Sequence, residues 1–266
     1  MEEILRFYEE TAESGRLKSG SGLLERVRTE EILSRYLPAP PATILDVGGG
    51  PGIYAGWLAS QGYQVYLVDP VQKHITEARG YPLSGFHLGD ARALPCEDVF
   101  ADAVLLMGPL YHLIERADRI RALREAARTL RPGGLLAATA ITRFASLMHS
   151  LVDGFVDDDV FWPILQGDLE SGLHRNETGK PAYFTTAAFH KPDELTAEVT
   201  EAGFTGIHLL AVEGPSWLAK DFDARWQDES RRARLLELAR RVESEPVLFC
   251  CSLHLIAIAE KEGATP

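Results

Sequence analysis

The fold is decided by the stretch Ile44-Leu45-Asp46-Val47-Gly48-Gly49-Gly50-Pro51-Gly52. Its apolar start predicts a buried strand, its glycines a tight turn, and the residues after it a helix. The spacing is acidic-x-Gly-x-Gly-x-Gly, with Asp46, Gly48, Gly50 and Gly52 in the four places. Glycines let the backbone N–H groups of such a turn approach a ligand closely, and the N-terminus of the following helix favours negative charge. We therefore expect a nucleotide ligand at the end of the first strand.

This stretch lies in a chain of ordinary composition. The 266 residues are 45% hydrophobic and 25% charged, which is typical of a globular protein with a sizeable core. Lys and Arg number 27 against 39 Asp and Glu, so the formal net charge is −12. A protein this acidic repels polyanions, and we expect no nucleic-acid partner.

Cysteine usage and the N-terminal residues indicate the compartment. The three cysteines have neither a metal-ligand spacing nor a disulfide framework. The chain starts with an acidic sequence where a signal peptide is basic, and no apolar run reaches the roughly 18 residues that span a bilayer. We expect a cytoplasmic protein with no membrane partner. His149, His174 and His190 match no compact zinc pattern, so no metal site is expected.

Two further acids follow predicted strands. Residues 63–68 form an apolar run that ends in Asp69, about 20 residues after the glycine turn, where a carboxylate can accept hydrogen bonds from a ribose diol. The alternative is that Asp69 caps the next helix. Residues 85–89 predict a third strand, and Asp90 follows it. Open α/β sheets bind ligands at the carboxyl ends of their strands, so the glycine turn, Asp69 and Asp90 are expected at one edge.

With the glycine turn, Asp69 and Asp90 in this order, the sequence resembles the class I S-adenosylmethionine-dependent methyltransferases. The turn Leu-Arg-Pro-Gly-Gly at residues 130–134 is also frequent in the small-molecule members of that family. The resemblance implies an α/β fold with a doubly wound, Rossmann-like, seven-stranded and mostly parallel sheet, whose last strand inserts antiparallel between the fifth and sixth. It implies S-adenosylmethionine as the cofactor, with Asp69 on the ribose hydroxyls, Pro70 near the adenine and Asp90 on the adenine amino group. The full set of implied cofactor contacts is Tyr8, Asp46, Gly48, Gly49, Gly50, Gly52, Asp69, Pro70, Asp90, Ala91, Met107 and Gly108.

The residues that leave the fourth predicted strand, 102–107, point to the acceptor. In the resembled family this segment faces both the methionine end of the cofactor and the acceptor, which makes Tyr111 and His112 the leading candidates for acceptor contact. His112 is the best candidate for a general base or an orienting group, and a structural histidine is the alternative. Residues 108–111 depart from the Asn-Pro-Pro-Tyr type of motif, which argues against methylation of DNA bases or protein glutamine.

Residues 142–188 interrupt the α/β alternation. The segment is too long for a plain loop, so we expect a partly helical insertion that covers the acceptor pocket as a lid. Arg143 at its start suits an anionic acceptor, with a structural ion pair as the equal alternative. Whether His174, Arg175 or Tyr183 contacts the acceptor is left open by the sequence.

The chain is expected to divide into four parts. Residues 1–41 form an N-terminal helical cap, in which Tyr8 either closes the cofactor pocket or packs helix on helix. Residues 42–141 form the cofactor-binding core, with its fifth strand at 135–141. Residues 142–188 are the lid, and 189–266 complete the sheet with a helical excursion and a last strand at 249–259.

Three functions fit these features. The leading one is methyl transfer from S-adenosylmethionine to an oxygen or nitrogen of a small-molecule acceptor, by a monomer or homodimer. The second is a non-catalytic regulator that binds S-adenosylmethionine. The third is a nicotinamide-dependent oxidoreductase, which is disfavoured because residues 48–52 lack the Gly-x-Gly-x-x-Gly form.

Overall fold

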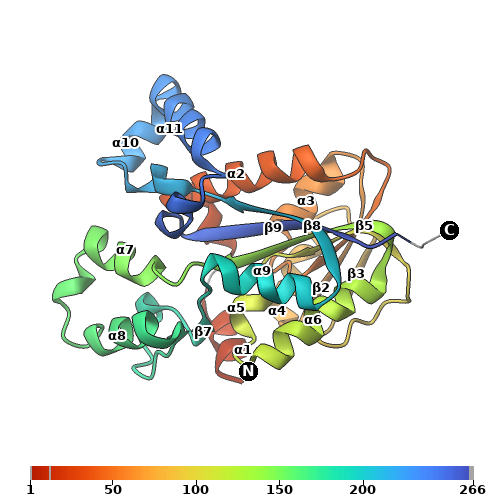
Figure 1. Ribbon diagram of the computed structural model, residues 1–266, viewed down its shortest axis with the longest axis horizontal. Coiled ribbons are helices and arrows are strands. Elements are labelled where there is room, and N and C mark those ends of the chain that lie inside the picture. Colours follow the sequence, from red (N-terminus) through yellow and green to blue (C-terminus); the bar gives the residue numbers. More distant parts are fainter. Residues whose placement is uncertain (1, 12, 264–266) are drawn as a thin grey trace.

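The computed structural model describes residues 2–11 and 13–263, and its centre is a seven-stranded sheet (Figure 1). In chain order its strands are β1 Thr43–Val47, β2 Gln64–Asp69, β3 Gly85–Leu88, β4 Ala101–Leu106, β5 Leu130–Ile141, β8 Phe204–Ala211 and β9 His254–Lys261. The spatial order is β3-β2-β1-β4-β5-β9-β8, and β9 runs antiparallel to both neighbours. This confirms the expected fold, including the insertion of the last strand between the fifth and sixth.

Helices cover both faces of the sheet, which explains why its central strands are mostly apolar. On one face lie α6 Arg116–Thr129 and α9 Pro192–Glu201; on the other lie α2 Ser21–Tyr36, α3 Ile53–Ser60 and α4 Gln72–Ala78. Within β1 the side chains alternate between these layers: Leu45 and Val47 face the first core cluster and Ile44 the second. All three are fully buried.

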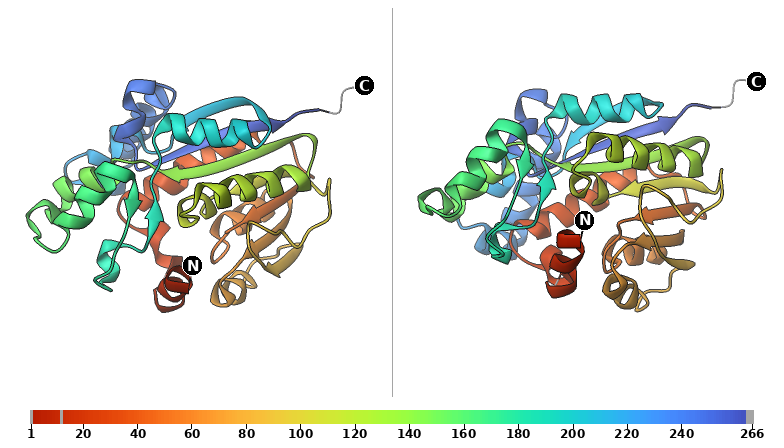
Figure 2. Two further views of the ribbon diagram at one scale, coloured as in Figure 1. Left: turned by 60° about the horizontal axis from the view of Figure 1, so that its bottom comes forward. Right: turned by 90° about the horizontal axis from the view of Figure 1, so that it is seen from below.

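The N-terminal segment lies at the carboxyl edge of the sheet. It consists of α1 Glu2–Glu10 and a 3₁₀ turn, η1 Glu13–Lys18, before α2 begins. Leu17 of η1 is buried against Ile53 and Tyr54, which anchors the segment on the first turn of α3. Figure 2 shows α1 between the core and the insertion.

The insertion after β5 is a small structure of its own. It contains α7 Ala145–Asp153, η2 Phe155–Asp157, α8 Trp162–Ser171 and η3 Pro181–Tyr183, with a two-stranded sheet of β6 Leu173–His174 and β7 Ala187–Ala188. Figure 1 shows α7 and α8 projecting from one end of the molecule. Phe161, Leu165 and Tyr183 form a separate hydrophobic cluster inside it.

The second excursion lies between β8 and β9, and it corrects one predicted strand. It consists of η4 Gly214–Leu218, α10 Phe222–Gln227, α11 Glu229–Val242 and η5 Pro246–Cys251. The last strand was expected from residue 249, but η5 occupies that stretch and β9 begins at His254. The fifth strand in turn begins at Leu130 rather than 135, because its first residue pairs with β4 ahead of a register shift.

Candidate functional site

A cavity opens at the carboxyl ends of the parallel strands, beside the N-terminal segment. Most of the predicted cofactor residues line it. Gly48, Gly49 and Gly50 come from the glycine turn. The others follow the ends of strands: Asp69 and Pro70 at β2, Asp90 and Ala91 at β3, and Met107 and Gly108 at β4. Tyr8 of α1 and the two acceptor candidates Tyr111 and His112 line it as well. Residues from distant parts of the chain thus meet in one cavity, as parallel strand topology requires.

The glycine turn has a backbone that side chains would disrupt. Gly48 and Gly50 have φ angles of 69° and 56°, in the left-handed region. A Cβ on Gly48 would come within 2.7 Å of the Pro109 ring. A Cβ on Gly50 would meet only His74 Nδ1, at 4.0 Å, so it would take up space in the cavity itself.

Asp46 and Gly52 do not line the cavity. Asp46 lies fully buried behind the turn, where a Cβ on Gly49 would be 2.5 Å from its Oδ2. Neither of its carboxyl oxygens has a hydrogen-bond partner, and burial, followed by the charge of Asp69, raises its pKa to about 7. Gly52 is the N-cap of α3. Both residues therefore shape the turn from behind rather than forming the cavity wall.

Asp69 joins the glycine turn to the segment after β2. Its Oδ2 accepts a hydrogen bond from Gly50 N at 2.9 Å, and its Oδ1 accepts one from Val71 N at 2.9 Å. Oδ1 is also 3.0 Å from His74 Nδ1. The N-cap of α4 is Val71, so the alternative that Asp69 caps this helix is wrong. Asp69 lies in the cavity wall.

Asp90 lies in the wall but is already paired. Arg92 donates to both of its carboxylate oxygens, at 3.0 and 2.5 Å for the closest contacts, and the Arg92 backbone N–H donates at 2.8 Å. These hydrogen bonds hold the pKa of Asp90 below its ordinary value. A carboxylate oxygen accepts more than one hydrogen bond, so a contact with an amino group remains open to it.

Tyr8 and His112 form a pair across the cavity. The Tyr8 hydroxyl and His112 Nε2 are 2.7 Å apart, and the two rings meet edge to face. Burial raises the pKa of Tyr8, so its O–H is retained, and burial lowers the pKa of His112 to about 3. His112 is therefore neutral at pH 7. Tyr111 is buried behind it, with its hydroxyl 3.3 Å from the Met107 carbonyl oxygen.

Arg143 was a candidate for acceptor binding, and that prediction is wrong. Its guanidinium donates to both carboxylate oxygens of Glu194, at 2.9 and 3.0 Å, and its Nε to the Phe189 carbonyl. The side chain is buried at the base of the insertion and does not line the cavity. Arg143 instead forms a structural ion pair, which was the alternative prediction.

The insertion also differs from its expected position. No residue of 142–188 lines the cavity; the N-terminal segment closes it instead, through Ile4, Leu5 and Leu17. The insertion approaches only at its end, where Phe184 lies 5.8 Å from the His112 ring and 5.7 Å from the Phe7 ring. His174 is occupied elsewhere, between Asp168 and the Tyr183 carbonyl.

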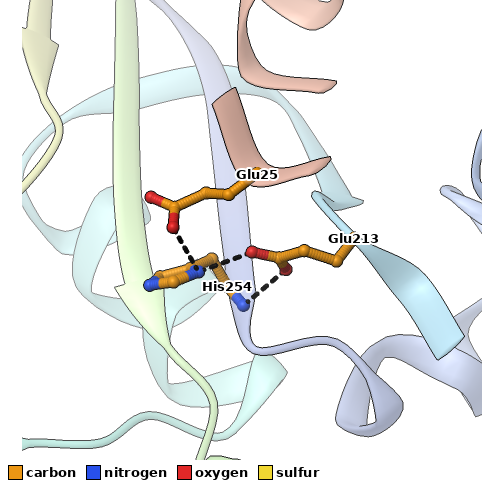
Figure 3. A group of neighbouring side chains, drawn as sticks. All are labelled: Glu25, Glu213 and His254. Atoms are coloured by element: carbon orange, nitrogen blue, oxygen red, sulfur yellow. Dashed lines mark hydrogen bonds and ion pairs between the residues drawn. The ribbon is translucent and has the colours of Figure 1, made fainter. Parts of the chain in front are cut away.

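A cluster of titratable side chains, Glu25, Glu213 and His254, has no signature in the sequence (Figure 3). Arg16 lines the cavity and donates to both oxygens of Glu25, at 2.5 and 2.9 Å. Glu25 Oε2 lies 3.8 Å from His254 Nδ1, which is also 2.7 Å from Glu213 Oε1. Burial alone would lower the pKa of His254, but Glu25 and Glu213 outweigh it and raise the pKa. No local motif joins residues so far apart in sequence.

Glu25, Glu213 and His254 have the ligand types of a metal site, and their ligand atoms lie within 4.8 Å of one another. Hydrogen bonds already engage both carboxylates, however. Arg16 binds Glu25 bidentately, and Glu213 Oε2 accepts from Ser252 Oγ at 2.7 Å and from His254 N at 3.0 Å. With His254 protonated, each carboxylate has a cationic partner, so the cluster is balanced by the protein's own charges.

His74 of α4 also forms part of the cavity wall. It is buried, and its Nε2 has no hydrogen-bond partner. Together with the acids at two strand ends and the open space beside Gly50, this polar atom suits a ligand with hydroxyl and amino donors such as S-adenosylmethionine.

Comparisons with known proteins agree with this geometry. Residues 45–138 match a methyltransferase domain family. An uncharacterized methyltransferase of Mycobacterium tuberculosis is 36% identical over 129 residues, which are 47% of this chain and 51% of the relative. The chain thus spans about half the length of this relative. A ubiquinone biosynthesis O-methyltransferase of Methylocella silvestris is 35% identical over 212 residues, 75% of each chain.

The crystal structure of an S-adenosylmethionine-dependent methyltransferase from Mesorhizobium loti superposes with a TM-score of 0.58. It covers 90% of this chain and 100% of its own, at 18% identity, and this likeness shows the fold alone. Among the described residues, no helix combines the length and the apolar character needed to cross a membrane.

Proposed function

The chain belongs to the class I S-adenosylmethionine-dependent methyltransferases, and we propose that it transfers the methyl group of this cofactor to an oxygen or nitrogen of a small molecule. The observation that carries the proposal is the single cavity that joins the glycine turn, the acids after β2 and β3, and the Tyr8–His112 pair. The first two bind a nucleoside, and the third offers polar groups where an acceptor would lie.

Each group in the cavity wall has a proposed task. Asp69 binds the ribose and Asp90 the adenine amino group, while Gly48 to Gly50 let the backbone lie against the cofactor. When bound, S-adenosylmethionine supplies an electrophilic methyl on a sulfonium. The residues around it contribute mainly orientation and exclusion of water, because the reactive group belongs to the cofactor.

His112 is proposed to orient the acceptor. Its low pKa makes it a weak base at neutral pH, so it does not store a proton. As a neutral ring it accepts a hydrogen bond at one nitrogen and donates at the other. The Tyr8 hydroxyl bonds Nε2 and fixes the ring, while the other ring nitrogen, Nδ1, is buried and faces the Thr186 backbone. Tyr111 packs behind His112, at 4.7 Å between ring centroids, and supports that position.

Oxygen is the favoured acceptor atom of the two. A relative that is matched over 75% of its length is named an O-methyltransferase of ubiquinone biosynthesis. The N-terminal segment presents apolar side chains to the cavity, Ile4, Leu5 and Leu17, which suit a hydroxyl carried on an apolar ring. We further propose action in the cytoplasm, as a monomer or homodimer, without nucleic acid or membrane.

Two assays test this proposal in order. Isothermal titration with S-adenosylmethionine, S-adenosylhomocysteine and NAD should show binding of the first two alone; binding of NAD alone would favour the oxidoreductase. Transfer of labelled methyl to any member of a panel of phenols, catechols and amines then separates an enzyme from a regulator. His112→Ala should lower turnover with little change in the Kd of S-adenosylhomocysteine, and unchanged turnover would remove His112 from the mechanism.

A further inference from the structure

His74 carries an unused hydrogen-bonding atom in the cavity wall. The residue is 4% exposed, and its Nε2 is buried without a partner. Buried polar atoms are almost always paired in folded proteins, and an exception calls for an explanation. Because His74 lines the cavity, a ligand bound there can supply the missing partner.

The chemistry of that partner follows from the other ring nitrogen. Nδ1 lies 3.0 Å from Asp69 Oδ1, and a carboxylate only accepts hydrogen bonds, so Nδ1 carries the proton. A neutral ring then has a lone pair at Nε2. The missing partner is therefore a donor, such as a hydroxyl, and an anionic group is disfavoured at this position.

The position of His74 indicates that the donor is a ribose hydroxyl. Asp69 Oδ2 accepts one hydrogen bond from Gly50 N and retains capacity for another. A Cβ on Gly50 would lie 4.0 Å from Nδ1 of the His74 ring, so the His74 ring and Asp69 Oδ2 both lie beside the glycine turn. Together they offer two acceptors, and a ribose diol offers two adjacent donors. The adenine amino group is expected one strand further along the edge, at Asp90. Tyr8 packs edge to face on the His74 ring, at 5.4 Å between centroids, and holds it in place.

We infer that His74 is a ribose-binding residue: Asp69 fixes its tautomer through Nδ1, and its Nε2 accepts a hydrogen bond from one ribose hydroxyl of S-adenosylmethionine. This rests on the cofactor of the proposed function but not on methyl transfer. The two acceptors also disfavour nucleotides that carry a phosphate on that hydroxyl, because the phosphate would place an anion against them.

The test is isothermal titration of the intact protein with S-adenosylhomocysteine and with its 2′-deoxy and 3′-deoxy analogues. His74→Phe keeps the ring and removes the acceptor, and it should weaken S-adenosylhomocysteine binding about tenfold, the value of one hydrogen bond. The wild type should lose a similar factor on the analogue that lacks the bonded hydroxyl. His74→Phe should lose no more on that analogue, since the bond is already absent.

A matched control is His149→Phe, which removes an exposed histidine paired with Asp153 at 2.8 Å, outside the cavity. It should leave all three affinities unchanged. Equal losses for His74→Phe on S-adenosylhomocysteine and both analogues, or no loss at all, would overturn the inference. Failure of the wild type to bind S-adenosylhomocysteine would instead contradict the cofactor assignment.

If His74→Phe does not fold, the wild type still decides the question. The ¹⁵N resonance of His74 Nε2 should move when S-adenosylhomocysteine is added and stay in place with the analogue that lacks the bonded hydroxyl. A resonance that responds equally to all three ligands would contradict the hydrogen bond.

Discussion

Two segments extend beyond the sheet at its carboxyl edge, and only one of them forms the cavity. The N-terminal segment, residues 2–11 and 13–18, has little core of its own and packs its apolar side chains against the cavity and α3. The insertion after β5 has its own hydrophobic cluster and its own buried hydrogen-bonded pair, Asp168 with His174. A segment that lacks an internal core depends on what it covers, so the N-terminal segment should respond to the cofactor and the insertion should not.

The first prediction separates the two segments through stability. Asp168 is fully buried, and both of its oxygens face His174 Nδ1. Asp168→Ala leaves the imidazole without its partner and should cost about 3 kcal/mol of unfolding free energy, measured by urea denaturation. The Kd for S-adenosylhomocysteine should stay within about twofold of the wild type, because the insertion does not line the cavity. A large loss of affinity in folded Asp168→Ala would join the insertion to the cofactor site.

The second prediction compares two arginines that each donate to both carboxylate oxygens of a glutamate, Arg16 through two nitrogens and Arg143 through Nη2 alone. Arg16→Ala removes a side chain of the cavity wall and frees η1 from Glu25, and it should weaken S-adenosylhomocysteine binding about tenfold. Arg143→Ala removes the matching pair with Glu194 at the base of the insertion and should leave that affinity unchanged. Titration calorimetry of both variants checks this, and equal effects would remove the contrast between the segments.

The third prediction concerns pH. The pKa of His254 is raised in the folded protein, so its contribution to stability is fully present below the unfolded pKa of about 6.5 and is lost as pH rises through the folded pKa. His254→Asn should therefore be destabilised most at pH 5 to 6, and its difference from the wild type should shrink at higher pH. Melting temperatures across this range measure the difference. A pH-independent difference would show that folding leaves the pKa of His254 unchanged, and a difference that shrinks toward low pH would show that the fold keeps His254 neutral.

The smallest expected effect is that of removing the Tyr8 hydroxyl. Tyr8→Phe keeps the ring contacts with His74 and His112 and removes one hydrogen bond, to His112 Nε2. We expect S-adenosylhomocysteine binding to weaken by no more than about threefold, and turnover to fall further because His112 loses its fixed orientation. Steady-state kinetics and titration of the same preparation separate the two. Turnover equal to that of the wild type would show that the ring packing alone orients His112.

The sequence predicts the strand-end residues of the cavity well and the residues that reach it from elsewhere poorly. The glycine turn at 48–52, Asp69 and Asp90 each lie at the carboxyl end of a parallel strand, so local pattern and topology together bring them to one edge. Arg16 and His74 reach the same cavity through the packing of η1 and the rotamer of a helix side chain, for which no periodicity gives a signal. The length of 142–188 indicates an insertion, but no motif or periodicity in it indicates on which side of the cavity it packs.

Hydrogen exchange measured with and without S-adenosylhomocysteine tests the central claim most directly. Peptides from residues 2–18 and from the glycine turn at 48–52 should gain protection together when the ligand binds, while peptides from α7 and α8 should exchange at unchanged rates. Protection of α7 and α8 without protection of residues 2–18 would contradict the account, because the insertion would then close the cavity and the N-terminal segment would not.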